Sequence, residues 1–163
     1  MDDKSTLDFA IYYTEEKNFS IIPLIGKIPD ASVLPKEPNE KGEPKPTWRP
    51  YQKRKPTQDE LQKWFGNGSK RNIGIVTGTI SGIAVVDLDG REAIQLAKDL
   101  ELPDTPVVKT ARGYHLYYRY RPGIRNFQKR DDLPGIDVRG DGGYVVAPPS
   151  IHTSGVQYAW AKG

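Results

Sequence analysis

Residues 83–90 read Ile-Ala-Val-Val-Asp-Leu-Asp-Gly, an unbroken apolar run that ends in two carboxylates one residue apart, Asp87 and Asp89. Side chains two apart on a β-strand share a face, and a rise of about 3.3 Å per residue places these two roughly 7 Å apart. Like charges at the end of a buried strand are costly unless a cation or a proton intervenes. The pattern therefore predicts a strand whose carboxyl end binds one or two divalent cations. The alternative is an ordinary turn, in which Asp and Gly are common.

The overall composition is that of a soluble globular protein, and a length of 163 residues suits one domain with a single core. The chain has no cysteine, which excludes disulfides and thiolate zinc sites, and two histidines are too few for a typical structural zinc site. A net charge of +3 permits a nucleic-acid partner. No signal peptide and no stretch of transmembrane length is found, so we expect a cytoplasmic protein without a membrane partner.

Hydrophobic periodicity and capping residues predict an α+β fold, with a mixed, largely antiparallel sheet and helices packed outside it. Helices are expected at 5–17, at 57–66 after a capping box of Thr57 and Glu60, and at 91–100. Strands are expected at 19–24, 73–78, 82–88, 106–110, 114–120, 135–139, 144–147 and 156–160. Residues 26–56 contain half of the chain's 14 prolines, so we expect a long connection there without helix or strand, either functional or disordered.

A histidine lies in the aromatic-rich strand predicted at 114–120, after a turn that carries Arg112 and Gly113. On this strand His115 shares one face with Tyr117 and Arg119. A lone histidine on a strand is more often structural than functional, so this residue alone does not decide between the two roles.

A second aspartate motif occupies residues 135–150, where Asp137 follows an apolar residue and precedes a glycine-dense turn. Asp137 is the natural third oxygen donor. The glycines at 140, 142 and 143 permit positive φ angles, which let main-chain amides approach a phosphate. The alternative is a hairpin with a permissive loop.

Taken in order, these motifs resemble the archaeo-eukaryotic primase superfamily, and within it the N-terminal domain of bifunctional DNA primase/polymerases (prim-pol) from plasmids, phages and mobile elements. The resemblance extends from about residue 20 to residue 160. It is carried by the segments 72–78 (NIGIVTG), 86–89 (VDLD), 110–115 (TARGYH) and 136–144 (IDVRGDGGY) with 147–150 (APPS). It implies that residues 1–163 are a single primase/polymerase catalytic domain with RRM-like elements.

The resemblance also implies a site and a reaction. Asp87, Asp89 and Asp137 are expected to hold two Mg²⁺ or Mn²⁺ ions, and His115 to contact the phosphates of the incoming nucleotide. The expected activity is template-directed nucleotidyl transfer by a DNA primase or DNA polymerase, in which a 3′-hydroxyl attacks a nucleoside triphosphate on a single-stranded DNA template with its primer.

Further contacts are expected from cationic and polar residues near these motifs. The candidates for nucleotide binding are Arg112, Gly113, Arg139, Lys109, Ser150 and Asn72. The candidates for nucleic-acid binding are Lys53, Arg54, Lys55, Lys70, Arg71, Arg119 and Arg125. Such cationic runs more often form a solvated face, which is the alternative for each residue.

Two other functions stay open at this stage. A metal-dependent phosphodiesterase or nuclease also uses paired aspartates and a histidine, with water as the nucleophile. The other open function is a non-catalytic module that binds single-stranded nucleic acid. Such a module gains no binding energy from carboxylates that repel phosphates. Because relatives usually continue into further subdomains, we expect this chain to be a catalytic core from a longer protein, with a fused or associated helicase as a further partner.

Overall fold

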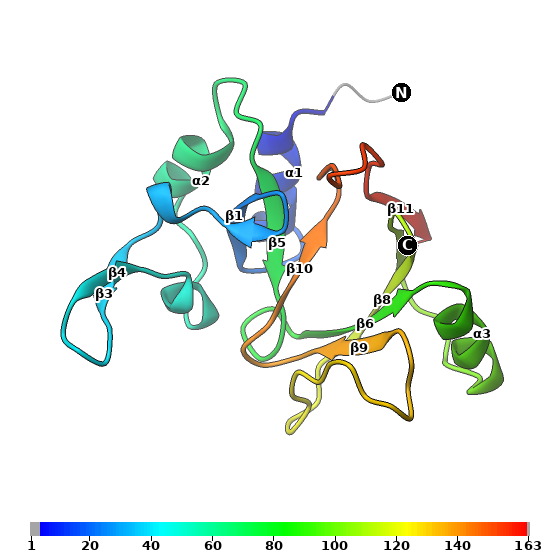
Figure 1. The fold of residues 1–163 in the computed structure, drawn as a ribbon. Coiled ribbons are helices and arrows are strands. Elements are labelled where there is room, and N and C mark those ends of the chain that lie inside the picture. The colour runs from blue at the N-terminus through cyan, green and yellow to red at the C-terminus, as the bar shows by residue number, and fades with distance from the viewer. Residues whose placement is uncertain (1–3, 163) are drawn as a thin grey trace.

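The computed structural model, described here for residues 4–162, contains three antiparallel β-sheets, of four, five and two strands, and three α-helices in the described part of the chain (Figure 1). The helices are α1 (Thr6–Glu15), α2 (Gln58–Phe65) and α3 (Arg91–Asp99). Ser5 and Thr57 begin the first two with capping boxes, which satisfy backbone N–H groups that a helix start leaves unpaired. The predicted α+β class is confirmed, with the strands divided between two large sheets and one two-stranded sheet where a single sheet was expected.

The first sheet has the strand order β10-β5-β1-β2. Its strands are β1 (Ile21–Ile25), β2 (Ile28–Pro29), β5 (Asn72–Val76) and β10 (Tyr144–Ala147). The apolar residues of β1 and β5 are almost all buried, and they form the main core with Tyr13 of α1 and Trp64 of α2. Burial of this many large apolar side chains is the main driving force for this half of the fold.

The second sheet has the order β11-β7-β8-β6-β9 and places the two aspartate motifs on neighbouring strands. Its strands are β6 (Ile83–Asp89), β7 (Val107–Lys109), β8 (Gly113–Arg119), β9 (Ile136–Arg139) and β11 (Ala159–Lys162). β11 begins three residues later than the strand predicted at 156–160. One face of this sheet packs against α3 through a small cluster that includes Leu88 and Ile136. The other face extends the main core through Val85, Val108 and Tyr117.

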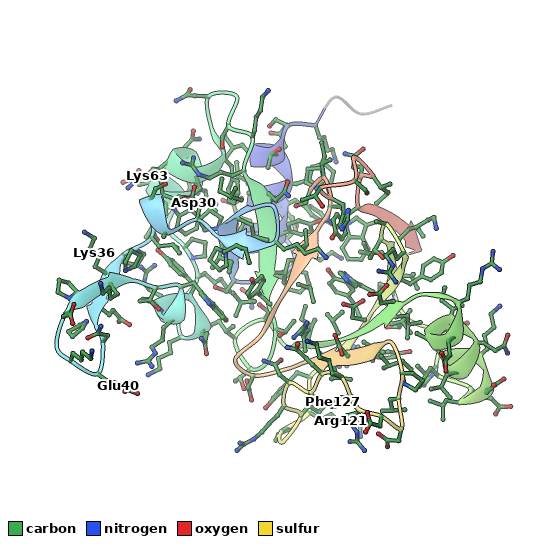
Figure 2. The ribbon with its side chains drawn as sticks, in the orientation of Figure 1. Asp30, Lys36, Glu40, Lys63, Arg121 and Phe127 are labelled. Carbon is green, nitrogen blue, oxygen red and sulfur yellow. The ribbon has the colours of Figure 1, made fainter. Side chains whose placement is uncertain are left out.

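The proline-rich connection is ordered, which corrects the prediction for residues 26–56. It contains β2, two short 3-10 helices (Ala31–Val33 and Arg49–Gln52) and a hairpin of β3 (Lys36–Pro38) and β4 (Pro44–Pro46). The hairpin extends away from the two sheets, with Lys36 and Glu40 on it (Figure 2). The prolines lie at the ends of these two strands, where no third strand needs their missing N–H donors. The local pattern did not reveal this arrangement.

The segment is also attached to the rest of the protein by aromatic side chains. The indole of Trp64 donates a hydrogen bond to the Val33 carbonyl at 3.3 Å, and Trp48 packs edge-on against Tyr144 with ring centroids 5.3 Å apart.

Among the described residues, no helix has the length and apolar character needed to cross a membrane.

Candidate active site

Strand β6 lies between β8 and β9, and its pairing with both aligns three candidate site residues. Asp87 is directly opposite His115 on one side and directly opposite Asp137 on the other. Opposite residues of paired strands point to the same face, with Cβ atoms about 5 Å apart. We call Asp87, His115 and Asp137 the acidic row. Asp89 lies two residues further along on the same face, opposite Gly113.

The acidic row lies where β6 leaves the core. Val85 is fully buried, the Asp87 side chain is 27% exposed, and the Asp89 side chain is 52% exposed. The apolar first half of the strand is held by the main core, and this fixes the register of the second half. A one-residue slip would move both carboxylates to the α3 face, so the buried apolar pattern positions the charges.

Each carboxylate of the site has a basic side chain as its neighbour, but two of these contacts are long. His115 Nε2 is 3.6 Å from Asp87 Oδ1, and Arg139 Nη2 is 3.7 Å from Asp137 Oδ2. Both distances exceed normal hydrogen-bond lengths, so these carboxylates keep lone pairs for a ligand. Asp137 Oδ1 also accepts a bond from the Lys129 amide at 3.1 Å, and Asp89 is 3.0 Å from the exposed Arg112 guanidinium.

A cavity of about 380 Å³ opens beside the acidic row, where the two sheets meet. Asp87, His115 and Arg139 line it from the second sheet, and Tyr144 lines it from β10 of the first. Its other polar wall residues are Lys27, Asn126, Gln128 and Tyr158. The volume falls within the range of small-molecule sites.

Sequence reasoning missed most of the residues that complete this cavity. Lys27 lies in the tight turn between β1 and β2, and only the packing of the two sheets brings this turn to the cavity. Tyr144 belongs to a motif that was recognised, but no role was assigned to it. Tyr158 carried no local signal, because only the fold brings it near Asp87.

The two tyrosines of the cavity keep their protons over a wide pH range. Burial, and next the Asp87 carboxylate, raise the pKa of Tyr158 above its ordinary value. Burial raises the pKa of Tyr144, and Arg139 partly offsets this. The Tyr144 hydroxyl donates to the Lys27 carbonyl at 2.7 Å, which holds the β1–β2 turn against the cavity.

His115 is 6% exposed, and its ring centroid lies 6.0 Å from that of Tyr158. Its Nδ1 atom is buried and has no hydrogen-bond partner among residues 4–162. An unpartnered buried polar atom is costly, and such atoms in a native structure are uncommon. Together with its position in the cavity wall, this favours a functional role for His115 over a purely structural one.

The donor chemistry suits a hard divalent cation, because Asp87, Asp89 and Asp137 all offer carboxylate oxygens on one face. In the described part of the chain, however, no group of three His, Asp or Glu side chains is gathered as a ready metal site. The residues therefore fit a Mg²⁺ or Mn²⁺ site chemically, with side-chain rotation needed to bring the oxygens together.

The other nucleotide-binding candidates divide into two groups. Arg112, Gly113 and Arg139 lie beside the acidic row. Gly113 must be glycine, because a Cβ atom there would lie 1.8 Å from the Leu88 carbonyl oxygen. Lys109, in contrast, pairs with Tyr114 and lies over its ring, on the α3 face of the sheet. Its predicted place beside the nucleotide is therefore not supported.

Asn72 and Ser150 have polar atoms that are already engaged in structural hydrogen bonds. The Ser150 hydroxyl accepts a bond from the Ile73 amide at 2.8 Å, and the Asn72 side chain bonds the backbone of Gly26 and Ile151. These bonds tie β5 to the segment after β10 and to the β1–β2 turn. They give both residues a structural role, and the predicted contact with nucleotide stays a prediction.

The glycine-dense turn also differs from its expected role. Only Gly142 of its three glycines has a positive φ, at 84°. Added Cβ atoms at Gly140 and Gly143 would lie 2.4 Å from the Ile124 carbonyl and 2.3 Å from the Asn126 side chain. The Gly140 and Gly143 amides are used internally, in bonds to Asn126 and to the Gly140 carbonyl. These glycines therefore permit close packing, and their amides are not free for a phosphate.

The predicted nucleic-acid contacts differ in exposure and in their partners. Arg54 pairs with Glu60 at 2.9 Å and Arg71 with Asp30 at 2.6 Å, so both take part in ion pairs that stabilise the fold. Lys53, Lys70, Arg119 and Arg125 are exposed and Lys55 is half-buried. Figure 2 shows Arg121 and Phe127 on the segment between β8 and β9.

The Prim-Pol family, described as the N-terminal domain of bifunctional DNA primase/polymerase, matches residues 10–163 of the chain. The match spans nearly the whole sequence and includes every strand of both sheets. No curated protein was found to match the chain.

Proposed function

The chain belongs to the N-terminal family of bifunctional DNA primase/polymerases, and from this premise we propose that it transfers nucleotides from nucleoside triphosphates to a 3′-hydroxyl on a single-stranded DNA template. The observation that carries this proposal is the acidic row at the mouth of the cavity between the sheets. It places two carboxylates and a histidine from three strands side by side, with Arg139 next to them. The family implies a nucleotidyltransferase-type enzyme. The acidic row supports the proposal that nucleotide transfer takes place at this cavity.

In this proposal Asp87, Asp89 and Asp137 hold a pair of Mg²⁺ or Mn²⁺ ions. When bound, such ions lower the pKa of the attacking hydroxyl and neutralise charge on the triphosphate. The repulsion among the three carboxylates favours this use, because a bound cation relieves it. Asp89 is free to join after it releases Arg112, since that contact is largely exposed and costs little to break.

The cationic side chains of the cavity bind the triphosphate. His115 donates from a nearly buried ring, Arg139 reaches the cavity from β9, and Lys27 reaches it from the turn between β1 and β2. Arginine pairs with phosphate oxygens through two parallel N–H donors, which orients the ligand as well as attracting it. Tyr144 and Tyr158 contribute neutral hydroxyls and apolar rings, which shield the reacting groups from water.

Primer extension tests the proposal. The purified chain is incubated with an end-labelled primer on a longer template, with Mg²⁺ or Mn²⁺, and with or without deoxynucleoside triphosphates. We expect lengthened primers only when triphosphates are present. Shortened primers without triphosphates would indicate a nuclease, and binding without any change in length would indicate a non-catalytic module; either result would overturn the proposal.

A matched pair of variants ties the reaction to the acidic row. Asp87→Asn removes one charge from the row, and we expect it to abolish extension. Asp99→Asn removes the same charge from α3, where the carboxylate only accepts a bond from Gln95 that an amide oxygen can also accept. We expect it to extend primers as well as the unchanged protein does.

A further inference from the structure

A second cavity, of about 440 Å³, lies at the other end of β8 from the acidic row. Tyr117 and Arg119 line it, two and four residues beyond His115, so it begins roughly 7 to 13 Å from that residue along the strand. Its remaining wall comes from α1, from the segment between α1 and β1, from the start of β6, from the two residues before β7, and from β11. No role in nucleotide transfer was given to it above.

The chemistry of this second cavity is unusual. Five of its wall residues are aromatic, and two are cations. The aromatic residues are Tyr12, Phe19, Tyr117, Tyr118 and Trp160. The cations are Lys17 and Arg119, and no carboxylate lines the cavity among the described residues. We call this cavity the aromatic pocket.

Several contacts hold the aromatic pocket in shape. The Trp160 indole donates to the Tyr13 hydroxyl at 3.0 Å, and that hydroxyl donates to the Pro148 carbonyl at 2.6 Å. Trp160 also packs on Tyr117 with ring centroids 4.9 Å apart. The floor of the aromatic pocket is therefore part of the protein core, while Tyr12, 43% exposed, forms an open edge of the pocket. A preformed aromatic floor binds a flat ring at little cost in side-chain entropy.

Both cations of the aromatic pocket are exposed, so they are accessible to phosphates. Lys17 Nζ is 5.7 Å from the centre of the Tyr12 ring, and Arg119 is exposed at the end of β8. Aromatic faces combined with cations are the features by which proteins bind single-stranded nucleic acid without reading its sequence, because every base offers a flat face and every nucleotide a phosphate. An apolar peptide has no negative group that could pair with these two cations, so it fits the pocket less well than single-stranded nucleic acid does.

We propose that the aromatic pocket binds a base of single-stranded DNA by stacking, while Lys17 and Arg119 pair with the neighbouring phosphates. The strand held there is the template, at a distance from the site of nucleotide transfer. The proposal rests on the proposed function only in taking DNA as the ligand. It assigns Arg119, alone among the cations predicted to contact nucleic acid, to a defined binding site.

Fluorescence anisotropy with a labelled oligodeoxythymidine, without triphosphate or divalent ion, tests the proposal. The double variant Tyr12→Ala with Arg119→Ala removes one exposed ring and one exposed cation. The matched control, Leu100→Ala with Lys98→Ala, removes one exposed apolar side chain and one exposed cation from α3 and the residue after it. We expect about 10-fold weaker binding for the pocket variant and a change below about 2-fold for the control. Equal affinity in both variants would overturn the proposal.

A second probe separates stacking from charge. An abasic oligonucleotide of the same length keeps the phosphates and lacks the bases. We expect the unchanged protein to prefer the base-bearing strand and the single variant Tyr12→Ala to lose much of that preference. If Tyr12→Ala leaves the preference unchanged, the pocket is not a stacking site. If free thymidine triphosphate displaces the oligonucleotide as well as another oligonucleotide does, the ligand is a free nucleotide and the strand assignment is wrong.

The design keeps this proposal distinct from nucleotide transfer. Binding is measured without turnover, so loss of extension in Asp87→Asn leaves the binding result unaffected. A pocket variant that binds DNA normally would overturn the stacking site while the transfer activity stands. Unfolding curves for Tyr12→Ala and Arg119→Ala check that the folded state persists, as their exposure leads us to expect.

Discussion

The Asp30 carboxylate and the carboxylates of the acidic row differ in how fully their hydrogen-bonding capacity is satisfied. Asp30 is 8% exposed, and it accepts bonds from Arg71 at 2.6 Å and from the Ser32 amide and hydroxyl at 3.0 and 2.7 Å. In the acidic row, the cationic contacts of Asp87 and Asp137 are 3.6 and 3.7 Å long, and a cavity opens beside them. A saturated carboxylate stabilises the fold, whereas a loosely paired one is available to a ligand.

The largest effect is expected from Asp137→Asn, the second carboxylate of the row. We expect primer extension to fall about 1,000-fold, because the reaction loses a ligand that acts on charge formed in the transition state. We expect the free energy of unfolding to change by less than about 0.5 kcal/mol, since the substitution relieves repulsion and keeps an oxygen for the Lys129 amide. Single-turnover extension measures the rate, and urea unfolding measures the free energy of unfolding. A large loss of stability would show that Asp137 has a structural role like that of Asp30.

The opposite result is expected from Asp30→Asn. Removing this charge leaves the Arg71 guanidinium largely buried and without its partner, so we expect a loss of about 3 kcal/mol in the free energy of unfolding. Urea unfolding at neutral pH measures it. Activity of the folded fraction is expected to be unchanged, because Asp30 does not line the cavity. A variant as stable as the unchanged protein would show that the ion pair contributes little.

Acid offers a third way to separate the two kinds of carboxylate. The hydrogen bond from Arg71, and next those from Ser32, hold the pKa of Asp30 below its ordinary value of 3.8. Its contribution to stability is therefore fully present above about pH 4 and is lost as the pH falls through the lower pKa of the folded state. We expect the stability difference between the unchanged protein and Asp30→Asn to shrink as the pH drops below 3.8. A difference that stays constant down to pH 2 would contradict this.

A smaller effect is expected from His115→Ala, which removes the histidine of the row. We expect the affinity for a nucleoside triphosphate to fall about 10-fold, because one hydrogen bond to a charged group is lost. Isothermal titration calorimetry measures it. His152→Ala is the matched control, since His152 bonds Ser154 and does not line the cavity. Equal losses in both variants would remove His115 from the site.

The smallest effect is expected from Arg112→Ala. The pair that Arg112 forms with Asp89 is exposed on both sides, so we expect a change in the free energy of unfolding below about 0.5 kcal/mol. A thermal or urea unfolding curve measures it. A loss as large as that of Asp30→Asn would show that exposure is a poor guide to the role of these pairs.

Local patterns predicted much of this molecule. The apolar run before Asp87 and the alternation around His115 gave the strands and their faces, and the capping box at Thr57 gave a helix start. These features depend on neighbours within a few residues. The same patterns identified the three carboxylates, and the structure places Asp87 and Asp137 directly opposite one another.

Features that depend on distant contacts were not predictable in this way. Consecutive strands β5 and β6 lie in different sheets, and Thr77 between them bonds the Gly140 carbonyl, 63 residues away. The hairpin in the proline-rich segment depends on which strand positions the prolines occupy, which composition does not show. The pairing of Arg71 with Asp30 and the placement of Lys27 also arise from the fold alone.

The most direct measurement is a titration with Mn²⁺, followed by the electron spin resonance signal of free Mn²⁺, in the presence of a non-hydrolysable triphosphate. The unchanged protein and Asp99→Asn should bind Mn²⁺ with equal affinity, while Asp87→Asn and Asp137→Asn should each bind it at least about 10-fold more weakly. If both row variants bind Mn²⁺ as tightly as Asp99→Asn does, the acidic row is not the metal site, and the assignment of nucleotide transfer to it is wrong.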